Sequence, residues 1–293
     1  DVSIVTTTHT ADGFADPEEA GNVIFNADIT GLNAGGGGTR KLTITAHNNI
    51  IFNNAITVTG GDLDLELRPG GDIQVKGVLT LHGGDFDAVL TGTNTITQTH
   101  AIKAALLKVV SATGDIVLSN AANEISTIDL TTVATAGNQG HIDFQDADGF
   151  AIHQIDQAIA QNSKVTLEAG GDITQTGGSN IDSGTGDFKI TSANTITLSH
   201  ADNDINGSLD LVNSGTKTTT VVNKTGNGDL KIKNFGADAG VQTLIITSDN
   251  TVIEAAIGGA AKNDKFEFTS HGSFDLGTGA TLTAQIDNTE LQR

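Results

Sequence analysis

The chain has no cysteine, methionine, tryptophan or tyrosine, and its 293 residues include only two prolines, Pro17 and Pro69. Without cysteine there is neither disulfide stapling nor thiol chemistry. Without tryptophan and tyrosine, the large rings that commonly stack on sugars are missing. No stretch reaches the roughly 18 consecutive apolar residues that a membrane helix requires, so we expect no membrane insertion.

Positive charge is also scarce. Lysine and arginine total 15 against 35 aspartates and glutamates, which gives a formal net charge of -20 and a pI near 4.4. Such a surface repels a phosphate backbone, so nucleic acid and anionic membranes are not expected partners. The arginines, Arg40, Arg68 and Arg293, are too few for a site that grips an acidic polymer through bidentate contacts.

The first residues, DVSIVTTTHT, show neither an initiator methionine nor the pattern of a secretory signal. We therefore interpret the chain as a mature or excised piece of a parent protein. The missing cysteine and the acidic surface rich in Thr, Asn and Gly favour an exported location.

An internal repeat organises the sequence. Residues 70–101 and 170–201 align without a gap and are identical at 14 of 32 positions, among them the Gly-Gly-Asp-Ile start, Asn-Thr-Ile-Thr and the final His-Ala. A second pair, LSNAANEISTIDL at 118–130 and LSHADNDINGSLDL at 198–211, matches with one inserted residue. Repeats with short insertions are typical of solenoids, whose surface loops tolerate them.

Strand-like runs fill nearly the whole length, and many open with Gly-Asp and one large apolar residue. Glycine accepts a positive φ at a tight corner, and aspartate hydrogen-bonds to nearby backbone there. Apolar and polar residues then alternate, as in Leu63, Leu65 and Leu67, which predicts one buried and one exposed face. The Gly-Asp corners occupy the following positions: 61–62, 71–72, 84–85, 114–115, 171–172, 186–187 and 228–229.

These signals predict an all-β fold and a single β-solenoid, with an irregular segment at residues 1–20 and a continuous coil at 21–293. Asn-Gly hairpin signals occur only at 206–207 and 227–228, so hairpins are not the organising unit. Two stretches contain good helix formers. We interpret 101–110 as a strand and 150–161 as a loop or irregular strand, with a short surface helix as the alternative for each.

Runs such as NIIFNNAITVTGGDLDLEL, GDIVLSNAANEI and KVTLEAGGDITQTGGSNI resemble the repeat region of filamentous-haemagglutinin-type exoproteins, which are large bacterial surface adhesins. The resemblance covers most of residues 20–285. It implies a right-handed parallel β-helix and a parent protein that is secreted or held on the bacterial cell surface. The amino-terminal secretion domain of that family is not evident in this chain.

The sequence predicts no catalytic, cofactor-binding or metal-binding residues. Three patterns are nevertheless candidates for a functional site. Acids two apart, Asp62/Asp64, Asp85/Asp87 and Asp202/Asp204, place both carboxylates on one side of a strand, as glycosidase chemistry requires. Repeated solvent-facing acids are the simpler interpretation.

Calcium is the second candidate. Asp143, Asp146 and Asp148 precede Gly149, and the stretch 258–266 resembles a glycine-rich calcium nonapeptide. Corner turns explain both. His100 and His200 share a repeat position, which favours a structural role.

The third candidate is an ice-binding ladder of Thr-x-Thr pairs, whose irregular spacing favours ordinary exposed strands instead. The pairs are Thr43/Thr45, Thr57/Thr59, Thr95/Thr97, Thr195/Thr197 and Thr281/Thr283.

The function predicted from these observations is that of a non-enzymatic, extracellular, adhesive β-helical rod. Its expected partners are other copies or segments of the same protein, stacked end to end, and cell-surface glycans or host surfaces. The alternatives are a carbohydrate-active β-helix enzyme, such as a polysaccharide lyase or hydrolase, and a calcium-dependent binding module.

Overall fold

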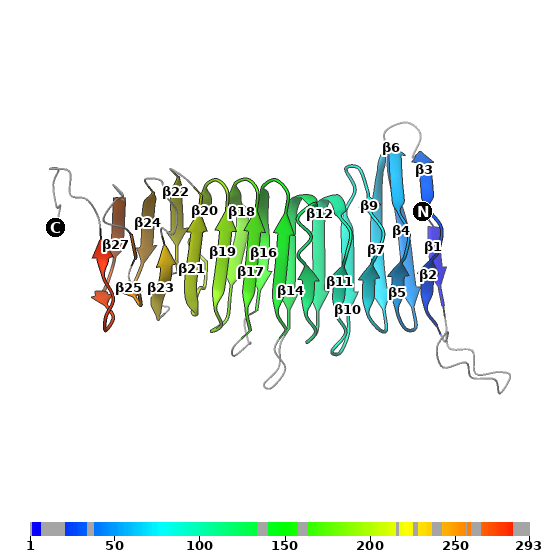
Figure 1. Cartoon of the computed structure of the whole chain (residues 1–293). Coiled ribbons are helices and arrows are strands. Elements are labelled where there is room, and N and C mark those ends of the chain that lie inside the picture. The colour runs from blue at the N-terminus through cyan, green and yellow to red at the C-terminus, as the bar shows by residue number, and fades with distance from the viewer. Residues whose placement is uncertain are drawn as a thin grey trace.

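The computed structural model describes residues 2–6, 21–33, 38–133, 140–157, 163–214, 217–224, 228–235, 242–255, 257–258 and 265–283. Within these ranges the chain contains strands and no helix, and it winds into a parallel β-solenoid (Figure 1). The coils follow one another along a rod, with the N-terminal coils at one end and the C-terminal coils at the other. The predicted fold class is confirmed.

Two large parallel sheets form the walls of the rod. Successive strands of one sheet are separated in sequence by one full coil. The separation of register partners runs from 20 residues for Ile96/Ile116 to 27 for Val23/Ile50, except between β1 and β4, where Val2 and Leu42 lie 40 residues apart. Sheet 2 consists, in spatial order, of β2 Val23–Phe25, β5 Ile50–Phe52, β8 Ile73–Val75, β11 Ile96–Gln98, β13 Ile116–Leu118, β15 Ile142–Asp146, β17 Val165–Ala169, β19 Phe188–Ser192, β21 Ser208–Asn213, β23 Asp229–Phe235, β25 Asn250–Ile253 and β28 Phe274–Leu276.

Sheet 1 faces sheet 2 across the core. Its main path is β1 Val2–Val5, β4 Thr39–Ala46, β7 Asp62–Pro69, β10 Phe86–Leu90, β12 Ile102–Ser111, β14 Glu124–Thr132, β16 Phe150–Asp156, β18 Ile173–Asp182, β20 Ile196–Leu198, β22 Thr218–Val222, β24 Thr243–Ser248 and β27 Lys265–Ser270. A short separate sheet pairs β26 Ile257–Gly258 with β29 Leu282–Thr283.

The N-terminal coils carry a third strand. β3 Ile29–Asn33, β6 Ile56–Gly60 and β9 Leu79–Thr80 form a branch that joins sheet 1 at β12. The first part of β12 pairs with β9, whereas its last five residues pair with β10. One long strand therefore takes the place of two, and the coils that follow β12 have two main walls instead of three.

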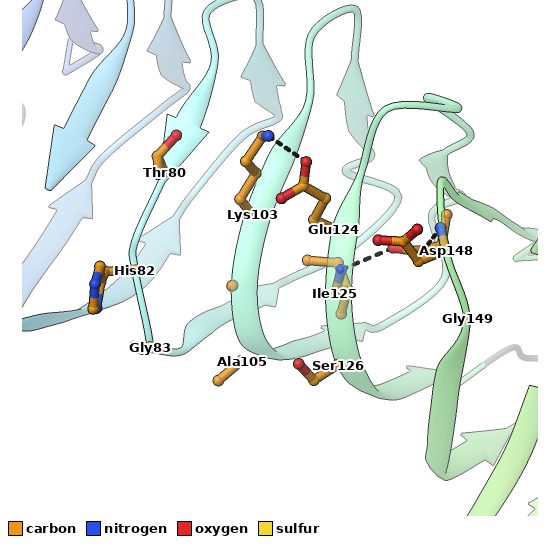
Figure 2. A pocket seen from close by; sticks show the side chains of 12 residues that line it. Thr80, His82, Gly83, Lys103, Ala105, Glu124, Ile125, Ser126, Asp148 and Gly149 are labelled. Carbon is orange, nitrogen blue, oxygen red and sulfur yellow. Dashed lines mark hydrogen bonds and ion pairs between the residues drawn. The ribbon is translucent and has the colours of Figure 1, made fainter. Parts of the chain in front are cut away.

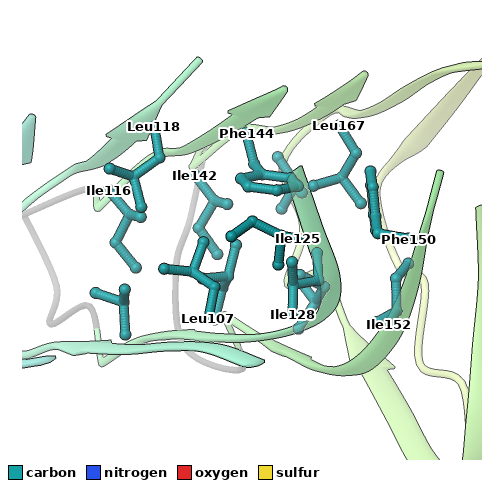
Figure 3. Packing of buried hydrophobic residues seen from close by; sticks show 14 of the residues in the cluster. Leu107, Ile116, Leu118, Ile125, Ile128, Ile142, Phe144, Phe150, Ile152 and Leu167 are labelled. Carbon is teal, nitrogen blue, oxygen red and sulfur yellow. The ribbon is translucent and has the colours of Figure 1, made fainter. Parts of the chain in front are cut away.

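The core consists of stacked aliphatic and phenylalanine side chains. Alternate residues of β7 and β10 are buried, as the period-two pattern predicted. In the middle of the rod, side chains from sheet 1, such as Leu107 and Ile128, meet side chains of sheet 2, such as Ile142 and Leu167 (Figure 3). Burial of apolar surface of this kind contributes about 25 cal/mol per Å² to folding.

At the corners, polar side chains continue the hydrogen bonding between coils. Asn22 Oδ1 accepts the Asn49 N–H at 2.9 Å, Asn49 Oδ1 accepts the Asp72 N–H at 2.7 Å, and Asp72 Oδ1 accepts the Thr95 N–H at 2.8 Å. Each corner side chain thus binds the equivalent residue of the next coil. This arrangement satisfies backbone donors at points where the sheet is interrupted.

Each copy of the repeat contributes strands to both sheets, but equivalent strands of the two copies lie in different sheets. Gly71-Asp72-Ile73 leads into β8 of sheet 2, whereas Gly171-Asp172-Ile173 leads into β18 of sheet 1. Their contacts are nevertheless equivalent, because Asp72 Oδ1 accepts from the N–H and hydroxyl of Thr95, and Asp172 Oδ1 accepts from those of Thr195. A shift of 100 residues therefore corresponds to four and a half coils, and the two walls use interchangeable sequence.

Other expectations are resolved in part. The stretch 101–110 forms strand β12, as predicted. In the stretch 150–161, β16 is a strand whose pairing register shifts near Ile152, and residues 158–162 lie outside the described ranges. The irregular segment at 1–20 needs correction at its start, because β1 pairs with β4 and extends the solenoid there; residues 7–20 lie outside the described ranges.

Candidate functional site

A groove of about 420 Å³ crosses the outside of the rod where the three-strand coils give way to the two-strand coils (Figure 2). It runs over β9, β12, β14 and the turn that precedes β16. The volume lies within the range typical of small-molecule sites. Small residues, including Ala105 of β12 and Ser126 of β14, leave the space open, and charged side chains border it.

The groove is hollow because of a local change in sequence. Gly84 lies so close to the preceding coil that a Cβ on it would sit 2.2 Å from the Leu63 carbonyl oxygen. Ala105 is the equivalent residue one coil later, since Phe86 pairs with Leu107. The chain turns sharply at the glycine but continues as a bent strand at the alanine. The step between these two paths produces the depression.

Its charged groups are held in fixed positions. Lys103 Nζ forms an ion pair with Glu124 Oε1 across neighbouring strands, and Figure 2 shows the two side chains facing one another. His82 has φ = 62°, the one positive value of a non-glycine residue among the described residues. Its Nδ1 lies 3.1 Å from Asp62 Oδ1, and the hydrogen bond from His82 lowers the pKa of Asp62. A backbone in this region is strained, and such strain is common at functional sites.

A buried carboxyl lies at the end of the groove nearest β16. Asp146 is 2% exposed; its Oδ2 accepts the Ile125 N–H at 2.8 Å and its Oδ1 accepts the Asp148 N–H at 3.0 Å. Burial raises its pKa to about 6, and the nearby carboxylates of Asp148 and Glu124 act in the same direction, against the two N–H donors. Asp146 is therefore a group whose charge changes under mildly acidic conditions.

Asparagine plays the same structural role in other coils, where its side-chain oxygen accepts the N–H of a buried isoleucine. The pairs are Asn123 with Ile102, Asn203 with Ile181, and Asn223 with Ile205, at 2.8, 3.1 and 2.8 Å. Asn123 and Asn203 also exchange two hydrogen bonds each with a glutamine amide, Gln98 and Gln175 respectively.

Sequence reasoning missed these buried amide pairs. The signal was present, because Asn123 and Asn203 occupy the same position in the second repeat, and Ile-Thr-Gln-Thr occurs at 96–99 and 173–176. Neither pattern says that the amides point inward, since that depends on which residues face the core.

A second cluster of charges lines a smaller hollow, of about 120 Å³, on the outer face of sheet 1. Asp64 aligns with Asp85 and Glu66 with Asp87, so that four carboxylates form a square on β7 and β10. Arg68 Nη2 lies 2.8 Å from Glu66 Oε1, and Arg68 Nη1 lies 3.3 Å from Asp87 Oδ1. The hydrogen bond from Lys41 lowers the pKa of Glu66, whereas partial burial and the neighbouring Asp64 raise the pKa of Asp85.

The paired acids therefore share an outward side, as predicted, but several serve the coil contacts. Asp62 Oδ1 accepts the Gly83 N–H and Asp64 Oδ1 accepts the Asp85 N–H. Asp204, from the third predicted pair, stacks on Asp182 of the previous coil. Like charges therefore lie close together along the rod. Partial burial, together with the neighbouring carboxylates of Asp204 and Asp156, raises the pKa of Asp182.

The calcium candidates are not assembled into a site. Asp143 lies in register with Val117 and Thr166, whereas Asp146 is buried and Asp148 is exposed. Across the described residues, no group of three or more His, Cys, Asp or Glu side chains is placed to hold a metal ion. Most of the stretch 258–266 lies outside the described ranges.

The remaining candidates occupy corners and short ladders. His100 and His200 both follow a strand, β11 and β20 respectively, in keeping with the predicted corner role. Thr57 stacks between Thr30 and Thr80, but Thr43 pairs with Glu66 and Thr45 with Arg68, so the threonines form no long uniform array in the described coils.

Comparison of the chain with protein-family models, with curated proteins and with solved structures finds no match. In the ranges that the structure describes, no helix has the length and apolarity needed to cross a membrane. The fold and the geometry of the groove are therefore the basis for assigning a role.

Proposed function

We propose that the chain is a non-enzymatic structural rod that works outside the cell, as a segment or subunit of a bacterial surface adhesin or filament. The observation that carries this proposal is the unbroken ladder of parallel coils from β1 and β2 to β27 and β28. Each coil is fastened to the next by backbone bonds, stacked apolar side chains and corner side chains. Such an object resists bending and spans distance, which is what a surface fibre requires.

The two ends of the described rod are chemically suited to each other. At one end, the inward-facing Val2 is 62% exposed; at the other, Phe274 and Leu276 are 41% and 46% exposed. Both ends present the outermost strands of the same two parallel sheets. A second copy placed head to tail would repeat the coil-to-coil contact that holds the rod together. Heterologous contacts of this kind produce open filaments.

Electron microscopy and sedimentation over a range of protein concentrations test the assembly. We expect thin filaments whose length grows with concentration, and we expect Phe274→Lys together with Leu276→Lys to leave a folded, monomeric rod. Val133→Lys is the control, because Val133 is 48% exposed but lies on the side of the rod. A wild-type protein that stays monomeric throughout, or equal loss of filaments in the control, would rule out end-to-end assembly.

Two further measurements test the rest of the proposal. Protease treatment of intact producing cells should remove the parent protein if it is on the surface, and protection from protease would contradict that location. Incubation with a panel of neutral and acidic polysaccharides should release neither reducing nor unsaturated sugars. Release that depends on Asp64 or Asp85 would favour the enzymatic alternative.

A further inference from the structure

We propose that the groove over β9, β12 and β14 binds a short segment of a neutral or amino-sugar glycan, laid along the rod axis. This inference rests on the proposed function to the extent that it supplies the ligand surface of an adhesive rod. It does not depend on filament formation.

The length and direction of the groove favour a linear polymer. Its lining comes from four successive coils, represented by Thr80, Lys103, Glu124 and Asp148. Since neighbouring strands lie about 4.8 Å apart, four coils span about 14 Å along the axis. The groove is open to solvent along one side, so an extended chain can lie in it without threading through a tunnel.

The lining offers both hydrogen-bond donors and acceptors. Lys103 donates, Glu124 and Asp148 accept, and the hydroxyls of Thr80 and Ser126 can do either. A row of sugar hydroxyls presents the same mixture of donors and acceptors. The apolar lining is limited to two alanines and Ile125, which leaves no pocket for a large hydrophobic side chain of a peptide.

Electrostatics decides which glycans fit. The carboxylates of Glu124, Asp146 and Asp148 outnumber the one lysine in the groove, and the whole chain has a formal charge of -20. Sulfated or uronic-acid polymers would be repelled, whereas a neutral chain or one with ammonium groups would not.

The site is also organised before any ligand arrives. The Lys103–Glu124 ion pair joins β12 to β14, the Asp148 N–H is fixed on Asp146, and His82 is held by Asp62. Fixing polar groups in advance reduces the conformational entropy lost on binding. His82, with its positive φ, lies at one end of the lining, and its imidazole is fixed on Asp62 of the preceding coil.

Isothermal titration of the whole chain with three oligosaccharide probes tests the proposal: a neutral β-glucan tetrasaccharide, a glucosamine tetrasaccharide and a galacturonate tetrasaccharide. We expect the neutral or the glucosamine probe to bind and the galacturonate probe not to bind. Glu124→Ala and the groove-filling Ala105→Leu should each weaken binding at least about tenfold. Glu168→Ala is the matched control, because Glu168 is an exposed glutamate on β17, outside the groove.

Circular dichroism and thermal melting of each variant separate lost binding from lost folding. Binding of the galacturonate probe alone, failure of all three probes, or equal weakening in Glu168→Ala would overturn the proposal. Calcium titration of the same samples is the last arm: a calcium site lost in Glu124→Ala, with no glycan binding in the wild type, would also overturn it. Each of these outcomes leaves the filament experiment unaffected, so failure of the groove and failure of the rod assembly can be told apart.

Discussion

The coil that contains β8, β9 and β10 differs from the next coil, which contains β11 and β12, although the two follow one another along the same rod (Figure 1). In the first coil, the sequence Leu-His-Gly-Gly-Asp at 81–85 separates two strands. In the second, Ala104, Ala105 and Leu106 stand at the equivalent register and the strand continues. The five-residue corner with its two adjacent glycines therefore accompanies a divided wall, and the shorter Ala-Ala-Leu stretch accompanies a merged one.

The comparison also explains where the groove lies. Between β9 and β10 the chain makes a tight corner, where Gly84 lies against Leu63 of the preceding coil. At the equivalent positions β12 and β14 continue as long strands. The depression forms at the boundary between the two geometries. A uniform solenoid of either type would have a smoother outer surface.

The largest expected effect comes from Gly84→Val, which adds a side chain to the close corner. Its Cβ would meet the carbonyl oxygen, carbon and nitrogen of Leu63 at 2.2, 2.3 and 2.6 Å, and backbone atoms there cannot move without breaking the ladder. We expect a loss of about 4 kcal/mol in the free energy of unfolding, measured by urea denaturation.

Gly177→Val is the control for that change, because no atom lies within 4 Å of a Cβ at Gly177. The reverse change in the two-strand region, Ala105→Gly, should cost only about 0.5–1 kcal/mol. Equal losses for Gly84→Val and Gly177→Val would show that close packing at the corner is not what divides the wall.

A smaller effect is expected from removing a buried amide in the two-strand region. Asn123→Ala leaves the Ile102 N–H without its acceptor and removes both hydrogen bonds to Gln98, whose Nε2 keeps only the His100 carbonyl oxygen, and we expect a loss of about 3 kcal/mol. Asn203→Ala should cost a similar amount, because its contacts to Gln175 and Ile181 are the same in kind.

Thermal or urea unfolding of both variants provides the measurement. Asn54→Ala in the three-strand region is the control, since its Nδ2 contact to Asp28 is exposed and 3.4 Å long. If Asn123→Ala were as mild as Asn54→Ala, the inward amides would not be holding the two-strand coils together.

The smallest expected effect depends on pH. The pKa of Asp146 is raised to about 6 from its ordinary 3.8, so the folded chain binds a proton there more tightly than the unfolded chain does. Its contribution to stability is fully present below about pH 4 and is lost as the pH rises through 6. Asp146→Asn, which copies the residue found at 123, 203 and 223, should therefore stabilise the rod by about 2 kcal/mol at pH 8.

The measurement is the difference in unfolding free energy between the variant and the wild type at pH 8 and at pH 4. The gain should vanish at pH 4, where the wild-type carboxyl is protonated. As a control, Asp143→Asn makes the same chemical change on the outer side of the same strand, β15, and its effects at the two pH values are compared with those of Asp146→Asn. A gain that is equal at both pH values would contradict a titration of Asp146.

Much of the fold could be predicted because it is encoded locally. The Gly-Asp corners at 71–72 and 171–172 do precede strands, and the alternation in β7 and β23 does separate buried from exposed residues. The paired acids Asp62/Asp64 and Asp85/Asp87 do lie on the outer side, whereas the candidate Asp146 is buried. The sequence did not reveal that Asp64 and Asp85 are neighbours, since they lie 21 residues apart and meet only through the coil register.

The groove could not be predicted for the same reason. Thr80, Lys103, Glu124 and Asp148 belong to no common motif and share no fixed spacing, because the coil length varies by several residues from one turn to the next. Only the pairing of strands brings them to one surface. Asp146 was a calcium candidate together with Asp143 and Asp148, although corner turns were the favoured interpretation; the structure turns the side chains of Asp143 and Asp146 in different directions.

The sequence by itself determined that this chain forms strands, that they alternate between a buried and an exposed face, and that they repeat. These properties depend on residues close together in the chain, through side-chain alternation and the freedom of glycine at corners. Only the tertiary structure decided which wall each strand joins. Equivalent strands of the copies at 70–101 and 170–201 are four and a half coils apart and therefore belong to opposite sheets. The tertiary structure also decided which polar side chains meet, since those contacts depend on the summed length of every coil between them.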